Sequence, residues 1–248
     1  MKFEMSRKSD MFHPYTLVIH PDFKELGDFI LSLPERFEKN EGVVIHKGRN
    51  ELRKMEYGGR EYVVKSFHRP NIINRFVYGI FRPSKAKRSY DHAELYLKIG
   101  VGTPQPVGYF NVRSGLLFDK SYYVSCLSTC PYVYNDLFRR KFDYEEEVLR
   151  EIGRVTAVLH EDYGRENILF QKTPEGIKLE IVDLNRMFVG TIGMKAGCKN
   201  FERLPATPQM HRWMAEEYAK ARGFDVEKCF ELMVAYRSTQ PGKIDNLY

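Results

Sequence analysis

The hydrophobic pattern of the chain changes near the middle of its 248 residues. Before about residue 130, short apolar segments such as Glu61–Phe67 follow glycine-containing turns, which is typical of β-strands joined in hairpins. Beyond that point, apolar residues recur at helical spacing, most clearly over residues 144–160. A β-rich lobe followed by an α-rich lobe is an α+β arrangement. We therefore expect two lobes, residues 1–130 and 131–248.

Periodicity and turn residues place the individual elements. Asp22 can cap a helix that Pro34 helps to end. In the first lobe we expect strands at 16–19, 43–45, 52–56, 61–67, 107–112, 116–120 and 121–127, and helices at 22–33 and 85–99. In the second lobe we expect a hairpin of 168–170 with 179–182, and helices at 144–160, 207–222 and 225–236.

Composition excludes several classes of protein. Hydrophobic residues make up 43% of the chain and charged residues 29%, which are ordinary values for a folded protein and not for a disordered tail or a fibre. No stretch approaches the roughly 18 apolar residues of a membrane span, and Met1–Lys8 lacks the apolar segment of a signal peptide, so we expect a cytoplasmic protein. The net charge of +6 favours an anionic partner.

Lys65 is the first candidate functional residue, because it lies near the end of a predicted strand whose neighbours are apolar. A lysine in that position can extend its ammonium group to solvent, which is the structural interpretation. The functional interpretation is a clamp for the phosphates of ATP. It rests on Val63-Val64-Lys65, which matches the Val-Ala-Ile-Lys arrangement of kinase strands.

The segment from His160 to Asn167 carries a second signal, His-x-Asp-x-x-x-x-Asn spacing directly before an apolar strand. In kinases the Asp of such a loop, here Asp162, accepts the proton of the acceptor hydroxyl, and the Asn, here Asn167, binds a metal ion. Asp183 ends the next predicted strand and is the second candidate metal ligand. Each feature alone fits a polar loop or turn. Their order and placement together indicate a kinase-like site for ATP and Mg²⁺.

The chain resembles the lipopolysaccharide core kinases (Kdo and heptose kinases), a branch of the protein-kinase-like superfamily. The resemblance extends from about Thr16 to the C-terminus. It is carried by Gly48-Arg49-Asn50, Val64–Phe67, Ser84–Tyr90, Gly102-Thr103-Pro104, Asp162–Phe170 and Val182–Met187. It implies a two-lobed protein-kinase-like fold and transfer of phosphate from ATP to a Kdo or heptose sugar of the lipopolysaccharide inner core. It also implies an acceptor linked to lipid A, and hence a peripheral place on the inner membrane of a Gram-negative bacterium.

The chain departs from the kinase pattern around the nucleotide. The Gly-x-Gly-x-x-Gly loop is absent, and only Gly48 lies at the expected turn, where backbone amides could still bind phosphate. Asp183-Leu184-Asn185 replaces Asp-Phe-Gly, which keeps the metal ligand and loses the glycine. The acidic partner of Lys65 is left open. Glu94 lies on the expected helix, but the register of the resemblance points nearer Ser89.

A further departure precedes the catalytic loop. The predicted helix end at His160 runs directly into Asp162, although the related kinases have a connector of several residues there. This short link keeps a catalytically inactive pseudokinase, acting as a binding module, open as an alternative. Another alternative is a small-molecule kinase of the aminoglycoside or choline type. The sequence does not decide the sugar, the hydroxyl group or the oligomeric state.

The segment from Lys65 to Arg88 contains seven Lys or Arg residues and no Asp or Glu, interleaved with aromatic and aliphatic residues. Such a segment can bind RNA or lie on an anionic membrane, and the plainer interpretation is a solvated loop. Because the resemblance implies a membrane lipid as acceptor, we favour contact with a membrane surface or lipid A phosphates over nucleic acid.

Overall fold

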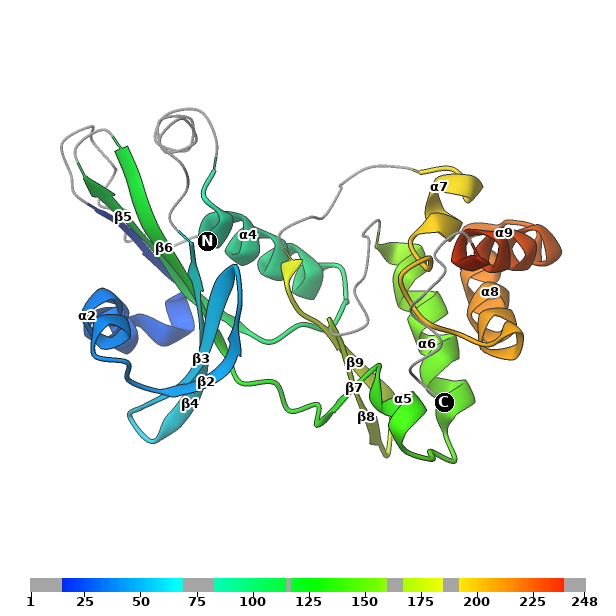
Figure 1. The fold of residues 1–248 in the computed structure, drawn as a ribbon, viewed down its shortest axis with the longest axis horizontal. Helices are drawn as coiled ribbons and strands as arrows, with labels where there is room; N and C mark the ends of the chain where they lie inside the picture. The colour runs from blue at the N-terminus through cyan, green and yellow to red at the C-terminus, as the bar shows by residue number, and fades with distance from the viewer. Residues whose placement is uncertain (1–14, 69–82, 115–116, 160–166, 185–191, 239–248) are drawn as a thin grey trace. The chain divides into compact units, whose positions relative to one another are not determined.

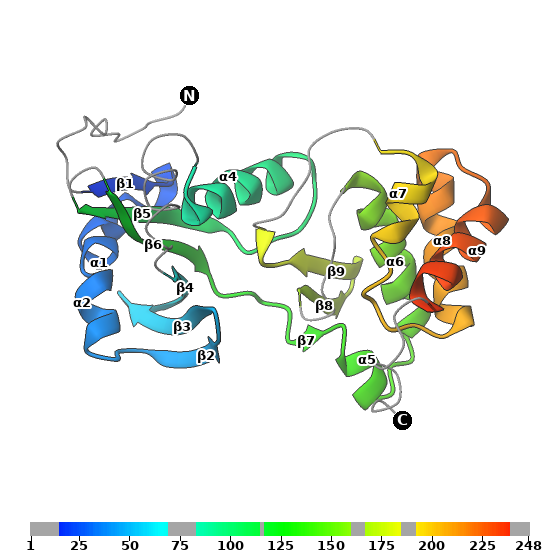
Figure 2. The same ribbon diagram turned by 45° about the horizontal axis from the view of Figure 1, so that its top comes forward.

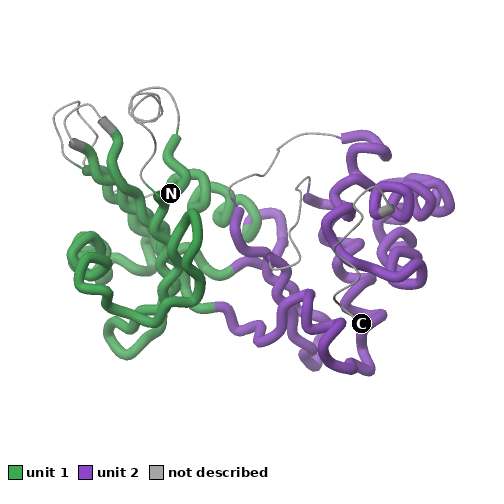
Figure 3. Tube along the Cα trace, viewed as in Figure 1, with its two compact units in different colours: residues 1–97, 104–127 green, residues 98–103, 128–248 purple. Residues whose placement is uncertain are grey.

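The computed structural model describes residues 15–68, 83–114, 117–159, 167–184 and 192–238. The chain divides into two compact units. The first comprises residues 1–97 and 104–127, and the second comprises residues 98–103 and 128–248 (Figure 3). Each unit contains its own antiparallel sheet.

A six-stranded antiparallel sheet forms the centre of the first unit (Figure 1). In spatial order its strands are β1 (Tyr15–Ile19), β5 (Pro106–Ser114), β6 (Leu117–Cys126), β4 (Arg60–Phe67), β3 (Asn50–Tyr57) and β2 (Val43–Lys47). The strand that carries Lys65, β4, is hydrogen-bonded on both sides, to β6 and to β3. At the edge, β2 exposes Val43, Val44 and Ile45, and a bulge between Val44 and His46 interrupts its pairing.

The expected strands of the first lobe are present with one correction. The two strands expected at 116–120 and 121–127 form one continuous strand, β6. The reason is that residues on both sides of Lys120 pair with the same neighbour, β5: Phe118 lies opposite Arg113, and Ser121 lies opposite Asn111. A strand that keeps its partner in this way needs no turn.

Three short consecutive helices cover one face of this sheet (Figure 2). They are η1 (Pro21–Leu26), a 3₁₀ helix, followed by α1 (Gly27–Leu31) and α2 (Leu33–Glu38). Their apolar side chains form the main core of the unit with β3, β4, β5 and β6, through Phe23, Leu26, Phe29, Ile30, Leu33, Met55, Tyr62, Val64, Phe110, Tyr122 and Val124.

The expectation of a single helix over 22–33, capped by Asp22 and ended by Pro34, is wrong. His20 caps η1, and its Nδ1 accepts a hydrogen bond from the backbone N–H of Asp22 at 3.2 Å. Pro34 lies in the first turn of α2 and therefore begins a helix. A backbone N–H in the first turn has no partner within the helix, so proline is accepted there.

The opposite face of the sheet is partly covered by α4 (Lys85–Lys98). Phe67 and Tyr109 of the sheet pack against Ala86 of this helix. The buried side of the helix consists of Ala86, Ser89, Ala93 and Tyr96. Successive side chains of a strand project to opposite faces, so Lys65 lies on the α4 face and Ser66 lies on the face covered by α2.

The second unit combines a three-stranded sheet with a group of helices. The strands are β7 (Tyr132–Val133), β8 (Ile168–Thr173) and β9 (Gly176–Ile181), and the helices are α5 (Asp136–Arg139), α6 (Glu145–Val158), α7 (Met194–Lys199), α8 (Pro208–Arg222) and α9 (Val226–Ser238). The hairpin and the three long helices expected from the sequence are present, and the helix ends shift by no more than two residues.

Among the long helices, α6 packs against α8, and α8 packs against α9. Gly153 of α6 allows a close crossing, because a Cβ atom there would lie 2.4 Å from the carbonyl oxygen of Met214 in α8. Among the helices that the structure describes, none is long and apolar enough to cross a lipid bilayer.

Candidate active site

Lys65 lies in the interior of the first unit's sheet. In register it is opposite Leu52 of β3 and Tyr123 of β6. Only 8% of the residue is exposed, and its Nζ lies 5.5 Å from the centroid of the Phe67 ring. An ammonium group near an aromatic ring is attracted by the negative face of the ring. The low exposure disagrees with a side chain extended into bulk solvent, and the phosphate-binding role of Lys65 stays a prediction.

Apolar side chains surround Lys65 on the same face of the sheet. Leu52 shares this face as its cross-strand partner, and Val63 shares it because it lies two residues earlier on β4. Val43 of β2 extends the surface, since it pairs with Lys54, which in turn pairs with Val63. Leu52 and Val63 are partly buried and Val43 is exposed, so a flat apolar ligand could cover them. Sequence reasoning missed this surface, because the alternation along β3 and β4 shows which residues share a face and not which strands pair in which register.

Gly48 lies in the two-residue turn between β2 and β3. Its backbone N–H donates to the carbonyl oxygen of Asn50 at 3.1 Å and closes the turn. A Cβ atom at Gly48 would lie 2.9 Å from Nε2 of His46, which is the movable end of a side chain. The turn is much shorter than a glycine-rich loop and offers few backbone amides. The phosphate-binding role of Gly48 stays a prediction.

The helix expected to supply an acidic partner for Lys65 is α4. Ser89 lies on the buried side of this helix and is 2% exposed, whereas the side chain of Glu94 is 40% exposed. Oε1 of Glu94 lies 3.7 Å from Nε2 of His20. Burial raises the pKa of Tyr123, and the negative charge of Glu94 adds to this rise, so Glu94 acts on the β6 neighbour of Lys65.

In the second unit, the β8–β9 hairpin brings Asn167 and Asp183 to the same end. Asn167 directly precedes β8, and its carbonyl oxygen accepts a hydrogen bond from the N–H of Val182 at 2.9 Å. Asp183 follows Val182, so the two candidate metal ligands lie on neighbouring backbone segments. Asp183 is exposed and has a φ of 63°, in the left-handed region, which residues other than glycine adopt uncommonly and Asp adopts more readily than most. Strained residues of this kind occur preferentially at functional sites.

Gly102 and Thr103 hold β9 in place close to Asp183. The N–H of Ile181 donates to the carbonyl oxygen of Gly102 at 2.9 Å, and Oγ1 of Thr103 donates to the carbonyl oxygen of Ile181 at 2.8 Å. A Cβ atom at Gly102 would lie 1.9 Å from the carbonyl oxygen of Leu179, so this approach requires glycine. The Gly102-Thr103 pair therefore positions the backbone two residues before Asp183.

Two of the sequence predictions lie outside the described residues: Asp162, and most of the basic segment between Lys65 and Arg88. The other candidates fall into two pairs. Lys65 and Gly48 belong to the first unit, and Asn167 and Asp183 belong to the second.

The donor set at the hairpin consists of oxygen atoms. Within the described ranges, no three His, Cys, Asp or Glu residues gather as a metal-binding cluster. Asn167 and Asp183 instead offer one amide and one carboxylate oxygen. Mg²⁺ is commonly bound by one or two carboxylates together with substrate phosphates and water. The pair therefore fits Mg²⁺ bound with a nucleotide and does not form a protein-only cage.

Comparison with known proteins gives a match at the level of structure. No protein-family model matches the chain, and no curated protein matches it. Among solved structures, "WaaP in complex with acyl carrier protein" is similar over 90% of this chain and 97% of that chain, with a TM-score of 0.62 and 15% identity. The bifunctional kinase-methyltransferase WbdD is similar over 79% of this chain and 44% of that chain, with a TM-score of 0.45 and 12% identity.

The match with WaaP spans nearly the whole of both chains. It confirms the expected α+β fold, with a β-rich N-terminal sheet followed by an α-rich C-terminal region. The resemblance to the lipopolysaccharide core kinases noted from the sequence is confirmed at the level of the fold. The chain has the kinase-like fold of WaaP.

Proposed function

We propose that the chain is an ATP-dependent phosphotransferase. The observation that carries the proposal is the β8–β9 hairpin, which brings Asn167 and Asp183 to neighbouring backbone positions in a fold that also holds a buried lysine, Lys65. Phosphoryl transfer requires chiefly positioning and charge stabilisation. A phosphate-binding lysine, two metal ligands and one base are therefore enough for the reaction.

On this proposal the first unit binds the nucleotide. Lys65 binds the phosphates of ATP through its ammonium group. Gly48 is the weaker phosphate-binding candidate, because its own N–H already donates to the carbonyl oxygen of Asn50. Leu52 and Val63 contact the base, because they form an apolar surface on the same face of the sheet as Lys65. Burial of Lys65 within the sheet limits its movement, so little order is lost when phosphate binds.

The second unit holds the metal ion. Asn167 and Asp183 would bind Mg²⁺ through the amide oxygen and the carboxylate. The ion, when bound, supplies positive charge to the phosphates during transfer. The strained backbone of Asp183 and the hydrogen bonds of β9 to Gly102 and Thr103 hold this end of the hairpin in one arrangement.

Asp162 accepts the proton of the attacking hydroxyl in this scheme. We propose a Kdo or heptose sugar of the lipopolysaccharide inner core as the acceptor, attached to lipid A, and this choice rests on the family resemblance. A peripheral position on a Gram-negative inner membrane rests on the same resemblance and on the basic, aromatic composition of the Lys65–Arg88 segment. An alcohol of the aminoglycoside or choline type is the alternative acceptor.

The competing function is a catalytically inactive pseudokinase that acts as a binding module. It is favoured by the direct run from His160 into Asp162 in the sequence. It is opposed by the presence of Lys65, Asn167 and Asp183, which a pure binding module does not need together. Binding and transfer must therefore be measured separately.

Nucleotide binding is tested by thermal unfolding of the full chain with Mg²⁺-ATP. Ligand at about 100 times its Kd stabilises the folded state by roughly 2.7 kcal/mol. We expect this stabilisation in the wild type and its loss in Lys65→Met and in Asp183→Asn. Glu175→Gln is the matched control, because Glu175 is exposed at the opposite end of the same hairpin. No stabilisation of the wild type at millimolar Mg²⁺-ATP would refute the proposal.

Transfer is tested with radiolabelled ATP and purified lipid A that carries its inner-core sugars. Replacing Asp162 with Asn should lower turnover by about 10²–10⁴-fold, the usual contribution of a general base, and should leave ATP affinity nearly unchanged. An Asp162→Asn variant that keeps most of the turnover shows that another group is the base. A wild type that binds ATP and phosphorylates neither this acceptor nor an aminoglycoside or choline is a pseudokinase.

A further inference from the structure

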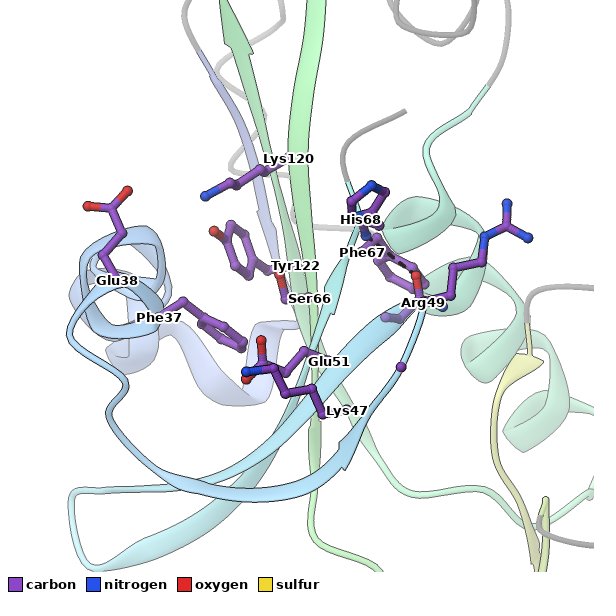
Figure 4. Close-up of a pocket in the computed structure, with 12 residues that line it drawn as sticks. Phe37, Glu38, Lys47, Arg49, Glu51, Ser66, Phe67, His68, Lys120 and Tyr122 are labelled. Atoms are coloured by element: carbon purple, nitrogen blue, oxygen red, sulfur yellow. Dashed lines mark hydrogen bonds between the residues drawn. The ribbon is translucent and has the colours of Figure 1, made fainter. Parts of the chain in front are cut away.

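A pocket of about 340 Å³ lies in the first unit between α2 and the sheet (Figure 4). Its walls come from the end of α2, the β2–β3 turn, the end of β4 and the middle of β6. The face assignment follows from alternation along β4, because Ser66 lines the pocket and its neighbour Lys65 projects to the other side. The polar row of the pocket therefore lies on the other face from Lys65, although Gly48 and Phe67 also line the pocket and adjoin the surface that we propose for the nucleotide.

The floor of the pocket is one row of polar side chains across four strands. Lys47 pairs with Glu51, Glu51 pairs with Ser66, and Ser66 pairs with Tyr122. Cross-strand partners project to the same face, so the four side chains form a continuous row. The ring of Phe37 from α2 lies beside this row, with its centroid 5.3 Å from that of Tyr122. Hydroxyl, carboxylate and ammonium groups next to an aromatic ring are suited to a polyhydroxylated ligand.

The hydroxyl of Tyr122 is the strongest indication of a ligand. Tyr122 is 0% exposed, and its Oη forms no hydrogen bond of good geometry, although the Ser66 hydroxyl of the same row acts on it as a poorly aligned partner. Burial raises the pKa of Tyr122 to about 12, the negative charges of Glu38 and Asp119 add to the rise and Ser66 lowers it, so the hydroxyl is a donor at neutral pH. In Figure 4 this hydroxyl and the end of Lys120 point toward the same space beside α2. An acceptor bound there would remove the cost of a buried hydroxyl without a well-aligned partner.

The charges around the pocket favour an anion. Glu51 is neutralised within the protein by Arg53, at 2.7 Å. Lys47 and Lys120 form no ion pair with any residue in the described part of the chain. Glu38 is the remaining acidic group in the lining, and it is exposed at the end of α2. Its charge and that of Asp119 act on the Tyr122 hydroxyl and oppose an anion there, so the two lysines must outweigh them. Two lysines without an acidic partner attract a negatively charged group.

We propose that this pocket binds a small sugar that carries a phosphate or a carboxylate group. The anionic group lies at the end formed by Lys120 and Tyr122, and the sugar hydroxyls face Ser66, Glu51 and Lys47 along the row. A volume of about 340 Å³ falls within the range of small-molecule sites and exceeds the size of a phosphate ion alone. The site shares Gly48 with the proposed nucleotide site, and its other polar groups are not used in the proposed transfer reaction.

Calorimetric titration of the full chain tests the proposal, with glucose 6-phosphate, glucuronate, glucose and inorganic phosphate as probes. We expect the two anionic sugars to bind more tightly than glucose or phosphate. The ratio of the Kd values of glucose 6-phosphate and glucuronate shows which anionic group is preferred. Lys120→Gln should weaken the anionic sugars by about tenfold and leave glucose unchanged, since it removes a charged hydrogen bond. Tyr122→Phe should weaken them by about fivefold and should not lower the unfolding temperature, because it removes a hydroxyl without a well-aligned partner.

Two controls separate this site from others. Lys39→Gln removes one positive charge, as Lys120→Gln does, but at a lysine that directly follows α2 and pairs with Glu35. This variant should leave sugar binding unchanged. Lys65→Met should abolish ATP binding and keep sugar binding. The proposal is overturned if neither anionic sugar binds at millimolar concentration, if Lys65→Met abolishes the binding, or if Lys120→Gln and Tyr122→Phe both bind as the wild type does. Inorganic phosphate binding as tightly as glucose 6-phosphate would also overturn it, since the sugar would then contribute nothing.

Discussion

The two units hold their candidate residues in different ways. Lys65 lies in the middle of a six-stranded sheet, 8% exposed, with apolar side chains on its own face and a large core on the other. Asn167 and Asp183 lie at the end of a hairpin, and Asp183 is exposed with a left-handed backbone. Many weak apolar contacts position the first site, whereas a few specific backbone contacts position the second. Single substitutions should therefore disturb the second unit more than the first.

The largest effect is expected at Gly102. A methyl group there would lie 1.9 Å from the carbonyl oxygen of Leu179, and neither backbone segment can move without breaking the hydrogen bond to Ile181. Gly102→Ala should therefore destabilise the folded state by about 3 kcal/mol, the upper range for overpacking. Gly193→Ala is the control in the same unit, because nothing lies within 4 Å of that position. Urea unfolding measures both, and equal midpoints for the two variants would contradict the close approach.

An intermediate effect is expected on acidification of the second unit. His211 is 2% exposed, and burial lowers its pKa from 6.5 to about 4, with Arg237 adding to the shift. Below pH 6.5 the unfolded chain binds a proton that the folded chain excludes, so stability falls as the pH decreases from about 6.5 to about 4. The loss between pH 7 and pH 5 should be roughly 2 kcal/mol. In His211→Gln the loss of unfolding free energy between pH 7 and pH 5 should be smaller than in the wild type by roughly 2 kcal/mol. An equal loss in the variant and the wild type would show that burial does not lower the pKa of His211.

The smallest effect compares one strained residue in each unit. Asp183 and Asn40 have φ values of 63° and 57°. Asp183→Gly should raise the unfolding free energy by about 1 kcal/mol, because glycine adopts this conformation without cost, and should abolish the Mg²⁺-ATP shift. Asn40→Gly should give no gain, since Oδ1 of Asn40 accepts a hydrogen bond from the buried Arg53 at 3.0 Å. If both variants gain equally, the strain at Asp183 has no special relation to function.

The features that could be predicted from the sequence are local ones. Strand alternation and helical periodicity located the elements, because each of these signals is contained within a few neighbouring residues. Spacing also singled out Lys65, Asn167 and Asp183, whose roles stay predictions. Pro34 was misjudged because proline can stand at either end of a helix, and only tertiary packing decides which.

The features that could not be predicted depend on pairing between distant segments. The apolar surface around Lys65 needs the register of β2, β3 and β4, and the close approach of Gly102 needs the position of Leu179. The polar row that ends at Tyr122 can be found only when the pairing registers of β2 with β3, β3 with β4 and β4 with β6 are all known. No local pattern in the sequence records these pairings, so the structure was required to find them.

One strand, β4, supplies side chains to both surfaces of the sheet, with Lys65 on one and Ser66 on the other. A substitution at either position alters one surface and leaves the other intact. Deleting or inserting one residue earlier in β4 would instead move every following side chain to the opposite face of the sheet. The ammonium group of Lys65 would then lie in the polar row, and the hydroxyl of Ser66 would lie on the face of α4. A one-residue change of length before Lys65 therefore disturbs both surfaces at once, whereas a substitution disturbs only one.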